Sequence, residues 1–198
     1  MPSPISDTRR TALLSMDMQS AIVSRYLGAH QDFLPRAASV LEQARAAGLT
    51  IVHVQVGFRA GLPEISTRNS LFGAIKTSPE WQQMFRGPAA QIHPEVAPLP
   101  EEIVVTKHRV SAFTGTDLDM ILRANEIETL VLFGIATSGV VLSTLIDAFD
   151  ADYRLIVVKD CCLDSDADVH ACLTEKFFPG RGSVLTAAEL LEALRPNS

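Results

Sequence analysis

Residues 129–149 read TLVLFGIATSGVVLSTLIDAF, and they show how this chain alternates between strand and helix. Thr129 to Phe133 is a continuously apolar run, which is typical of a strand that helices cover on both faces. Small residues follow from Gly134, and a helical pattern runs from about Gly139 to Phe149. A buried strand followed directly by a helix is the repeating unit of a parallel α/β sheet.

The same alternation continues on both sides of this stretch. Similar apolar runs predict strands at Ala12 to Met16, Ile51 to Val56, Ile103 to Thr106, Leu155 to Val158 and, more weakly, Ser183 to Leu185. Helical patterns lie between them, at Pro35 to Gly48, from Thr116 onward, at about Asp168 to Phe178 and at Ala187 to Leu194. We therefore predict an α/β fold with a Rossmann-like, doubly wound, mainly parallel six-stranded sheet and helices on both faces.

The length of 198 residues predicts a single domain over residues 1–198, with a polar N-terminal tail at residues 1–10. Two segments interrupt the alternation of strands and helices. Gly57 to Arg86 mixes polar and apolar residues and is interpreted as a lid or a partner-facing excursion. The proline-rich stretch from Gly87 to Pro100 is expected to be an extended surface connection.

The composition excludes several classes of protein. With 47% hydrophobic and 20% charged residues, the chain is expected to fold and not to be disordered. The formal net charge is -6 and no stretch gathers basic residues, so no nucleic-acid partner is expected. No apolar run approaches the ~20 residues of a membrane helix, and the first ten residues lack a secretory hydrophobic segment. We expect no membrane association and a cytoplasmic location.

Sequence motifs of several common chemistries are missing. There is no G-x-G-x-x-G after a strand, no P-loop, no H-E-x-x-H and no G-x-S-x-G, so nucleotide, zinc-protease and serine-hydrolase functions are not favoured. The five histidines are scattered, and His53, inside a predicted strand, is interpreted as a core or subunit-interface residue. Three cysteines, an odd number, are interpreted as reduced and mostly buried thiols.

Three predicted strands end in residues suited to chemistry. Asp17 follows the first strand and Lys107 follows the third. Because the carboxyl ends of parallel strands meet at one edge of a sheet, we expect the ammonium to lie near the carboxylate and to lower its pKa. The small residues from Gly134 to Val140 permit close backbone approach at a helix start, where free amides favour negative charge. The sequence thus predicts a site at this edge.

Three groups of residues, in this order and spacing, carry a family resemblance: Asp17-Met18-Gln19, Lys107-His108-Arg109-Val110-Ser111-Ala112-Phe113, and Gly134 through Ala148. Over almost its whole length the chain resembles the isochorismatase-like hydrolases, or cysteine hydrolases, which include nicotinamidases, N-carbamoylsarcosine amidases and isochorismatases. The resemblance implies the same fold, hydrolysis of a small-molecule substrate, and a homodimer or homotetramer. It also implies a non-proline cis peptide bond at Ile135-Ala136.

One position departs from the pattern of the family's amidases, in which an aspartate, a lysine and a cysteine work together. Asp17 and Lys107 match the first two, but the position of the nucleophile falls on Val140, which has no atom able to attack. Isochorismatases also lack this cysteine and hydrolyse a vinyl ether without a covalent intermediate. We therefore expect hydrolysis of a vinyl ether or C–N bond by Asp-assisted water attack, with no thioester.

Two alternatives stay open. In the first, the chain is a catalytically silent member of the family that binds a metabolite or partner. In the second, it is an amidase whose nucleophile stands at another position. Cys161 and Cys162 end the neighbouring strand, although packed small residues are the preferred interpretation of both. Ser138 and Thr137 have no evident histidine partner in the sequence, and an unactivated hydroxyl is a poor nucleophile.

The resemblance also implies which residues bind a small polar or carboxylated substrate. These are Gln55, Arg68, Arg109 and Phe113, together with Ile135, Ala136 and Ser138 of the turn after the fourth strand. Metal-binding nicotinamidases carry an aspartate two positions before a histidine, whereas Ile51 stands two positions before His53 here. We therefore expect neither a metal nor another cofactor.

Overall fold

The computed structural model describes residues 5–195. Six strands form one sheet in the order β3-β2-β1-β4-β5-β6, and every neighbouring pair is parallel. This confirms the predicted α/β class with its six-stranded sheet. The strands are β1 Thr11–Met16, β2 Thr50–Val56, β3 Ile103–Lys107, β4 Thr129–Ile135, β5 Arg154–Leu163 and β6 Ser183–Leu185.

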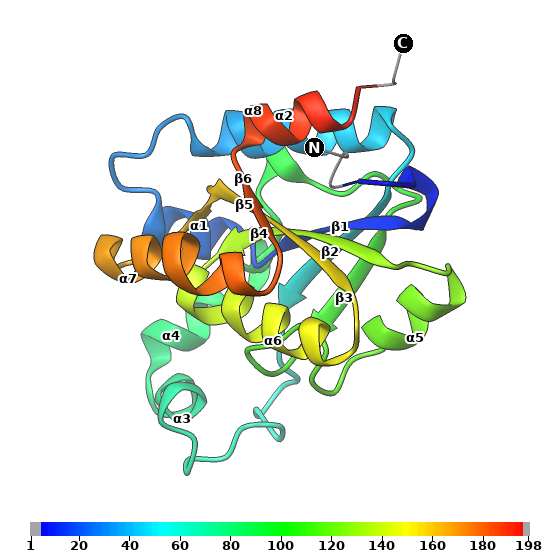
Figure 1. Cartoon of the computed structure of the whole chain (residues 1–198). Coiled ribbons are helices and arrows are strands. Elements are labelled where there is room, and N and C mark those ends of the chain that lie inside the picture. The colour runs from blue at the N-terminus through cyan, green and yellow to red at the C-terminus, as the bar shows by residue number, and fades with distance from the viewer. Residues whose placement is uncertain (1–4, 196–198) are drawn as a thin grey trace.

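Helices cover both faces of the sheet (Figure 1). One face carries α2 Phe33–Ala46 and α8 Ala187–Ala193, and the other carries α5 Leu118–Ala124 and α6 Leu142–Asp150. Four further helices gather near the carboxyl ends of the strands: α1 Ser20–Tyr26, α3 Ser70–Thr77, α4 Pro79–Met84 and α7 Ala167–Cys172. None of the helices between residues 5 and 195 has the length and hydrophobicity needed to span a bilayer.

The hydrophobic core lies on both sides of the two central strands. Every residue of β1 and of β4 is buried, because each strand has a neighbour on both edges and helices on both faces. The edge strand β3 alternates instead, with Val104 and Thr106 exposed and Val105 and Lys107 buried. The continuous apolar runs in the sequence therefore mark the central strands, as expected for a parallel sheet.

Several elements differ from the sequence prediction. Strand β5 continues to Leu163 because Lys159 and Asp160 interrupt the apolar run without ending the strand. Residues 1–4 of the expected polar tail lie outside the described residues, and Ile5 packs into the core. Thr8–Arg10 forms a short 3-10 turn. The tail prediction is thus wrong from residue 5 onward, since an apolar side chain anchors the segment.

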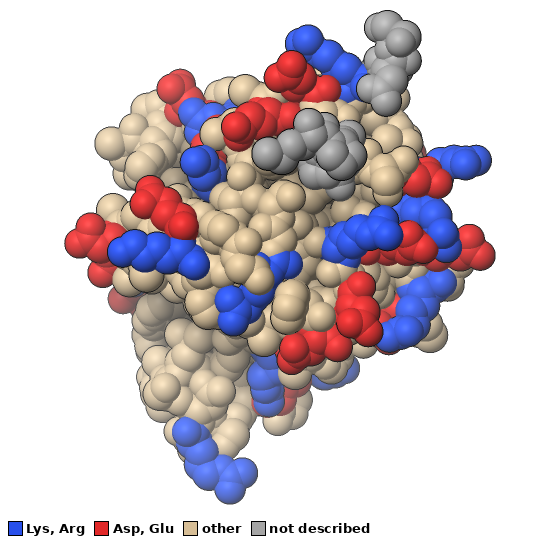
Figure 2. Space-filling model, viewed as in Figure 1, with Lys and Arg blue, Asp and Glu red and all other residues tan. Residues whose placement is uncertain are grey.

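The segment from Gly57 to Arg86, interpreted from the sequence as a lid or a partner-facing excursion, contains the helices α3 and α4. These helices enclose a small apolar cluster of their own, formed by Leu62, Ile65, Phe72 and Ile75. Figure 2 shows the lobe that contains α3 and α4 at the lower left, with few charged side chains on that face, whereas acidic and basic side chains are interspersed over the rest. We call residues 57–86 the lid, because several of its side chains wall the cavity described below.

A buried polar cluster joins β2 to the segment before β3. His53 is fully buried on β2, and its Nε2 lies 3.0 Å from Glu102 Oε2. Glu102 also accepts hydrogen bonds from Arg45 Nε at 2.6 Å and from the Leu99 amide at 2.8 Å. Burial alone would raise the pKa of Glu102, but the bonds from Arg45, Leu99 and His53 outweigh it and hold the pKa at about 2. His53 is thus a core residue, as predicted.

This cluster predicts a pH-dependent contribution to stability. Because the pKa of Glu102 is lower in the folded protein, its ionised carboxylate stabilises the fold at pH values above the ordinary pKa of 4.5. That stabilisation is lost as the pH falls toward 2. Glu102→Gln is expected to lower the free energy of unfolding by about 2 kcal/mol at neutral pH, and by less on acidification. Urea unfolding across this pH range measures the difference. Glu101→Gln, at the exposed neighbour, is the matched control, and an equal loss in both variants would contradict the prediction.

Candidate active site

Asp17 is the residue directly after β1, and its backbone has a φ of 54°. This left-handed conformation is uncommon outside glycine, and aspartate tolerates it better than most residues. Its amide donates to the Val54 carbonyl at 2.8 Å, so the turned backbone remains attached to β2. The side chain is 9% exposed. The turn therefore places a carboxylate inside the protein at the carboxyl end of the sheet.

Lys107 ends β3, two strands away from β1 in the sheet. Its side chain is 3% exposed, and Nζ lies 2.8 Å from Asp17 Oδ2. Nζ also donates to the Arg109 carbonyl at 3.1 Å. In the parallel register Lys107 is opposite Val56, the last residue of β2, so the lysine reaches past the end of β2 to the aspartate. The structure thus brings the two predicted strand-end charges into contact.

The electrostatics of Asp17 differ from the sequence expectation. Burial raises the pKa of its carboxyl, and the Lys107 ammonium lowers it by a smaller amount, so that the pKa lies above the ordinary value of 3.8. The expectation of a lowered pKa was wrong because it neglected the cost of burying the charged form. Within the described part of the chain, Asp17 Oδ1 is buried and has no hydrogen-bond partner. One carboxylate oxygen therefore remains free.

The turn after β4 lies beside this pair. The Ile135-Ala136 peptide bond is cis, as expected. Gly134 has a φ of 148°, and a Cβ there would lie 2.1 Å from the Met16 carbonyl oxygen. Only glycine permits this approach of β4 to the end of β1. The turn continues through Thr137–Val141 into α6, so Val140, which the sequence analysis matched to the nucleophile position, lies just before that helix.

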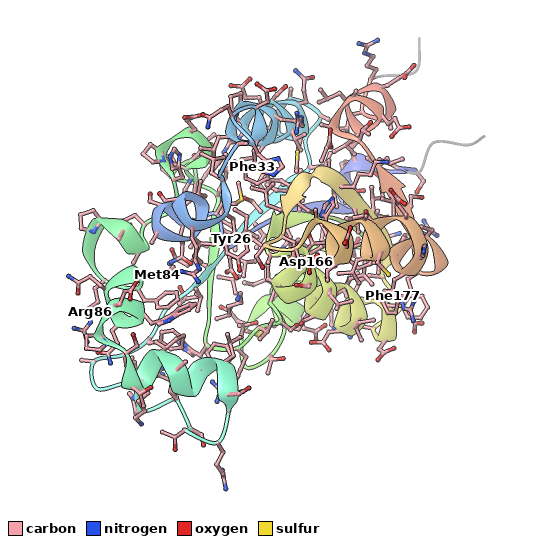
Figure 3. All side chains as sticks on the ribbon, turned by 90° about the vertical axis from the view of Figure 1, so that its left-hand side faces the viewer. Tyr26, Phe33, Met84, Arg86, Asp166 and Phe177 are labelled. Atoms are coloured by element: carbon pink, nitrogen blue, oxygen red, sulfur yellow. The ribbon has the colours of Figure 1, made fainter. Side chains whose placement is uncertain are left out.

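A cavity of about 150 Å³ joins these elements. Asp17, Lys107, Ile135, Ala136 and Val140 all line it. The remaining lining is mostly apolar and comes from α1 and the lid, including Phe72, Trp81, Met84 and Phe85. Figure 3 looks onto this side of the molecule, with Tyr26 of α1 and Met84 of α4 labelled. We call this space the Asp17 cavity.

The structure does not bring every predicted substrate-binding residue to the Asp17 cavity. Gln55 is outside its lining and donates to Thr106 Oγ1 at 3.1 Å, since it points away along the β2–β3 pair. Arg68 is exposed in the lid loop. Ser138 is exposed, and its amide donates to Asp164 Oδ2 at 2.7 Å. None of these three side chains lines the Asp17 cavity, because sequence position at a strand end or loop does not determine where a side chain points.

Arg109 and Phe113 also lie outside the lining of this cavity, and both have structural contacts. The Arg109 guanidinium donates to the carbonyls of His108 at 2.6 Å and of Glu64 at 2.9 Å, which ties the β3–α5 loop to the lid. The ring of Phe113 packs 6.1 Å from that of Tyr153. Arg109 thus contacts the lid and Phe113 contacts Tyr153, and neither side chain lines the Asp17 cavity.

Sequence reasoning missed two polar residues of the cavity, Arg25 and Tyr26. Both come from α1, a short helix that the sequence analysis did not predict. Arg25 stacks over the ring of Trp81, with Cζ 4.8 Å from the ring centroid, and has no carboxylate partner among residues 5–195. The available signal was their position eight and nine residues after Asp17, which the short helix α1 brings back to the strand end.

The remaining candidate nucleophiles have other surroundings. Cys161 and Cys162 are buried, Cys172 is exposed, and none of the three lines the Asp17 cavity. Burial raises the pKa of Cys162 to about 12 and also raises that of Cys161, which makes both poor nucleophiles. The relocated-cysteine alternative therefore lacks a suitable thiol at the site.

Thr137 has a histidine partner that the sequence did not reveal. Its Oγ1 lies 2.8 Å from His170 Nδ1, so the expectation of no partner was wrong. The same hydroxyl is fully buried and donates to the Leu163 carbonyl at 3.1 Å. Its one proton is already engaged, and Thr137 is outside the lining of the Asp17 cavity. The pair is a structural contact of the turn.

Comparisons with known proteins match this architecture. The family model for the isochorismatase domain matches residues 11–189. The chain belongs to the isochorismatase family. It is 29% identical over 192 residues to a maleamate amidohydrolase from Pseudomonas putida, covering 94% of this chain and 88% of that protein. It is 34% identical over 179 residues to a ureidoacrylate amidohydrolase from Stutzerimonas stutzeri, covering 80% and 72%.

Solved structures of the isochorismatase family have the same fold. An isochorismatase family protein from Burkholderia thailandensis superposes with a TM-score of 0.76 at 31% identity, covering 94% of this chain and 96% of that one. Within residues 5–195 of the present isochorismatase-family chain, no group of three or more His, Cys, Asp or Glu side chains is arranged to hold a metal ion.

The position of Val140 is testable with a thiol. In a Cys172→Ala background, Val140→Cys is expected to react with iodoacetamide at neutral pH. The new side chain lines a cavity beside the Lys107 ammonium at a helix start, and both features favour thiolate. Mass spectrometry of the labelled protein measures the reaction. The background protein, with only buried Cys161 and Cys162, is the control and should stay unlabelled. An inert introduced thiol would contradict the assignment of Val140 to the cavity.

Proposed function

We propose that this chain is a hydrolase that cleaves a small organic molecule by attack of water, with Asp17 as the proton-transferring group and no covalent intermediate. The observation that carries the proposal is the buried Asp17 carboxyl. Its Oδ2 pairs with Lys107 at 2.8 Å, while Oδ1 has no hydrogen-bond partner among the described residues. A buried oxygen without a partner is unfavourable unless a ligand or water donates a hydrogen bond to it. Oδ1 is therefore the atom assigned to the reacting water.

The residue at the helix start supports attack by water. The family's amidases carry a cysteine where Val140 stands, and valine cannot form a covalent bond to a substrate. Val140 is 2% exposed and lines the Asp17 cavity, so it contributes an apolar wall there. With the cysteines of the chain outside this cavity, the nucleophile must enter with the substrate, and water is the simplest one.

The proposed reaction transfers one proton through Asp17. Asp17 accepts a proton from water as the water oxygen forms a bond to the carbonyl carbon of an amide. The C–N bond then breaks, and Asp17 returns the proton to the leaving nitrogen. Burial makes the carboxylate a stronger base than an exposed aspartate, whereas the Lys107 ammonium keeps its ionised form accessible.

The lining of the Asp17 cavity constrains the substrate. Lid residues such as Phe72 and Trp81 favour an apolar body, and the volume of about 150 Å³ limits its size. Among the described residues that line the cavity, Arg25 is the cation without a carboxylate partner. It therefore replaces Arg68 and Arg109 as the proposed partner of a substrate carboxylate. The relatives named as maleamate and ureidoacrylate amidohydrolases favour an amide of a small carboxylic acid over a vinyl ether.

A second candidate function is binding without turnover. The apolar wall at Val140 and the aromatic lid would hold a metabolite in the same cavity even if no reaction followed. A screen of the purified protein against amides, enol ethers and lactones, with products followed by mass spectrometry, separates the two functions. Ligand protection without any product would favour the silent member.

The role of Asp17 predicts both a loss of turnover and a pH profile. Asp17→Asn is expected to lower kcat by ~10²-fold or more, because the variant cannot accept a proton. In the wild type, kcat/KM should fall on acidification with a midpoint above 3.8, since burial raises the pKa of the required base. Circular dichroism checks that the variant folds. Asp152→Asn, at an exposed aspartate that also has a positive φ, is the control. Unchanged turnover in Asp17→Asn would refute the mechanism.

The role of Arg25 predicts selectivity for charged substrates. Arg25→Gln should raise KM about tenfold for an amide that carries a terminal carboxylate, which corresponds to one lost charge-assisted hydrogen bond. The matching uncharged amide should be unaffected. Arg86→Gln is the matched control, because Arg86 is an exposed lid arginine outside the Asp17 cavity (Figure 3). Equal effects on charged and uncharged amides would contradict this role.

A further inference from the structure

A second cavity lies near the carboxyl end of β5, separate from the one that holds Asp17. It has a volume of about 220 Å³ and is bounded by the segment before α2, the start of α2, the end of β5 and α7. In Figure 3 the starts of α2 and α7 are marked by Phe33 and Asp166, on the same side of the molecule as Tyr26. We call it the β5 cavity. Its ionisable side chains other than cysteine are His30, Arg36, Lys159, Asp160, Asp164 and His170.

The two carboxylates of the β5 cavity already have partners in the protein. Asp160 Oδ1 accepts from the Ala187 amide at 2.7 Å, and Oδ2 lies 3.5 Å from Arg36 Nε. Asp164 Oδ2 accepts from the Ser138 amide at 2.7 Å. These contacts hold both carboxylates in place, and the Arg36 guanidinium offsets the charge of Asp160.

Three nitrogen groups of the same cavity lack partners. Among residues 5–195, neither the Lys159 ammonium nor the His30 imidazole makes a hydrogen bond or ion pair. His170 uses Nδ1 alone. Because the Thr137 hydroxyl donates its hydrogen bond to the Leu163 carbonyl, it accepts a hydrogen bond from His170 Nδ1, which places the proton of the neutral ring on that nitrogen. Nε2 of His170 is left without a protein partner.

We propose that the β5 cavity binds a small oxyanion, either a carboxylate or a phosphate group, held by Lys159, His30 and His170. Lys159 supplies a permanent positive charge, and each imidazole becomes a further donor when it is protonated. Phe33 and Leu163 line the same cavity and provide an apolar wall that limits access of water to the bound anion. The inference concerns a site outside the Asp17 cavity and does not depend on the proposed hydrolase function.

Binding of the anion is coupled to uptake of a proton. Burial lowers the pKa of His170, Asp164 and Glu175 raise it, and His30 and Lys159 lower it, with a net decrease. Asp160 and Arg36 also face the cavity and form a pair with each other. A bound anion favours the charged imidazolium, so it raises the pKa of His170, and by linkage the anion binds more tightly as pH falls.

Hydrogen bonds connect the β5 cavity to the turn after β4, which also lines the Asp17 cavity, and one of them joins His170 to Thr137. His170 donates to Thr137, and Thr137 follows Ala136, which lines the Asp17 cavity. Protonation of His170 Nε2 leaves the hydrogen bond from Nδ1 to Thr137 in place. Anion binding therefore changes the charge next to the turn after β4 while His170 still holds Thr137. This contact gives the second site a direct physical route to the first.

The test uses the full chain with sodium phosphate and sodium acetate as probes, at constant ionic strength. Imidazole proton signals in NMR report on all five histidines, and the His170→Gln variant assigns one of them. The expected result is a saturable shift of the His30 and His170 signals, a higher pKa for His170, and tighter binding at lower pH. A response to phosphate alone identifies a phosphate site, and a response to acetate alone identifies a carboxylate site.

The matched variants decide whether the effect comes from this cavity. Lys159→Gln should weaken binding about tenfold, the effect of one lost charge-assisted contact. Lys176→Gln is the control, because Lys176 is exposed on the turn after α7 and outside the cavity. The proposal is overturned if neither probe shifts the His30 and His170 signals, if His53, His93 and His108 shift equally, or if both lysine variants bind like the wild type.

Discussion

The ion pair between Asp17 and Lys107 is the interaction on which the site depends. Both side chains are nearly excluded from water, and an isolated buried charge costs several kcal/mol. The 2.8 Å contact offsets part of that cost only while the ends of β1 and β3 stay in register around β2. Gln19 stabilises this end of the sheet, since its amide bonds to both backbone groups of Val56 and to the Ala90 carbonyl.

The surroundings of the pair explain why its chemistry differs from that of a surface ion pair. Apolar side chains of the lid and of α1 remove water from the Asp17 cavity, which raises the pKa of the carboxyl and strengthens every charge interaction within it. Arg25 is held over Trp81 at the same cavity. The apolar lining thus tunes Asp17, and the charged group on α1 adds a positive charge to the same cavity.

Residues that look catalytic in the sequence can be structural, and the loop after β3 illustrates this. Ser111 Oγ donates to Asp147 Oδ2 at 2.5 Å, and the Ala112 amide donates to Thr144 Oγ1 at 3.0 Å, so both bind the loop to α6. Arg109 joins the same loop to the lid. Their shared function is to hold Lys107 and the lid in place, and a linear motif does not distinguish such anchoring from contact with substrate.

The amino-acid sequence alone was sufficient to place the chemistry-bearing strand ends together, because apolar runs define buried strands and parallel strands end at the same edge. Asp17, Lys107 and the turn at Gly134 could therefore be grouped before any coordinates were known. The tertiary structure was needed to determine where side chains point, why the pKa of Asp17 is raised, and which contacts Arg25 and His170 make. Those properties depend on burial and on contacts between segments far apart in the chain, such as Thr137 with His170 and Arg25 with Trp81, which local periodicity does not encode.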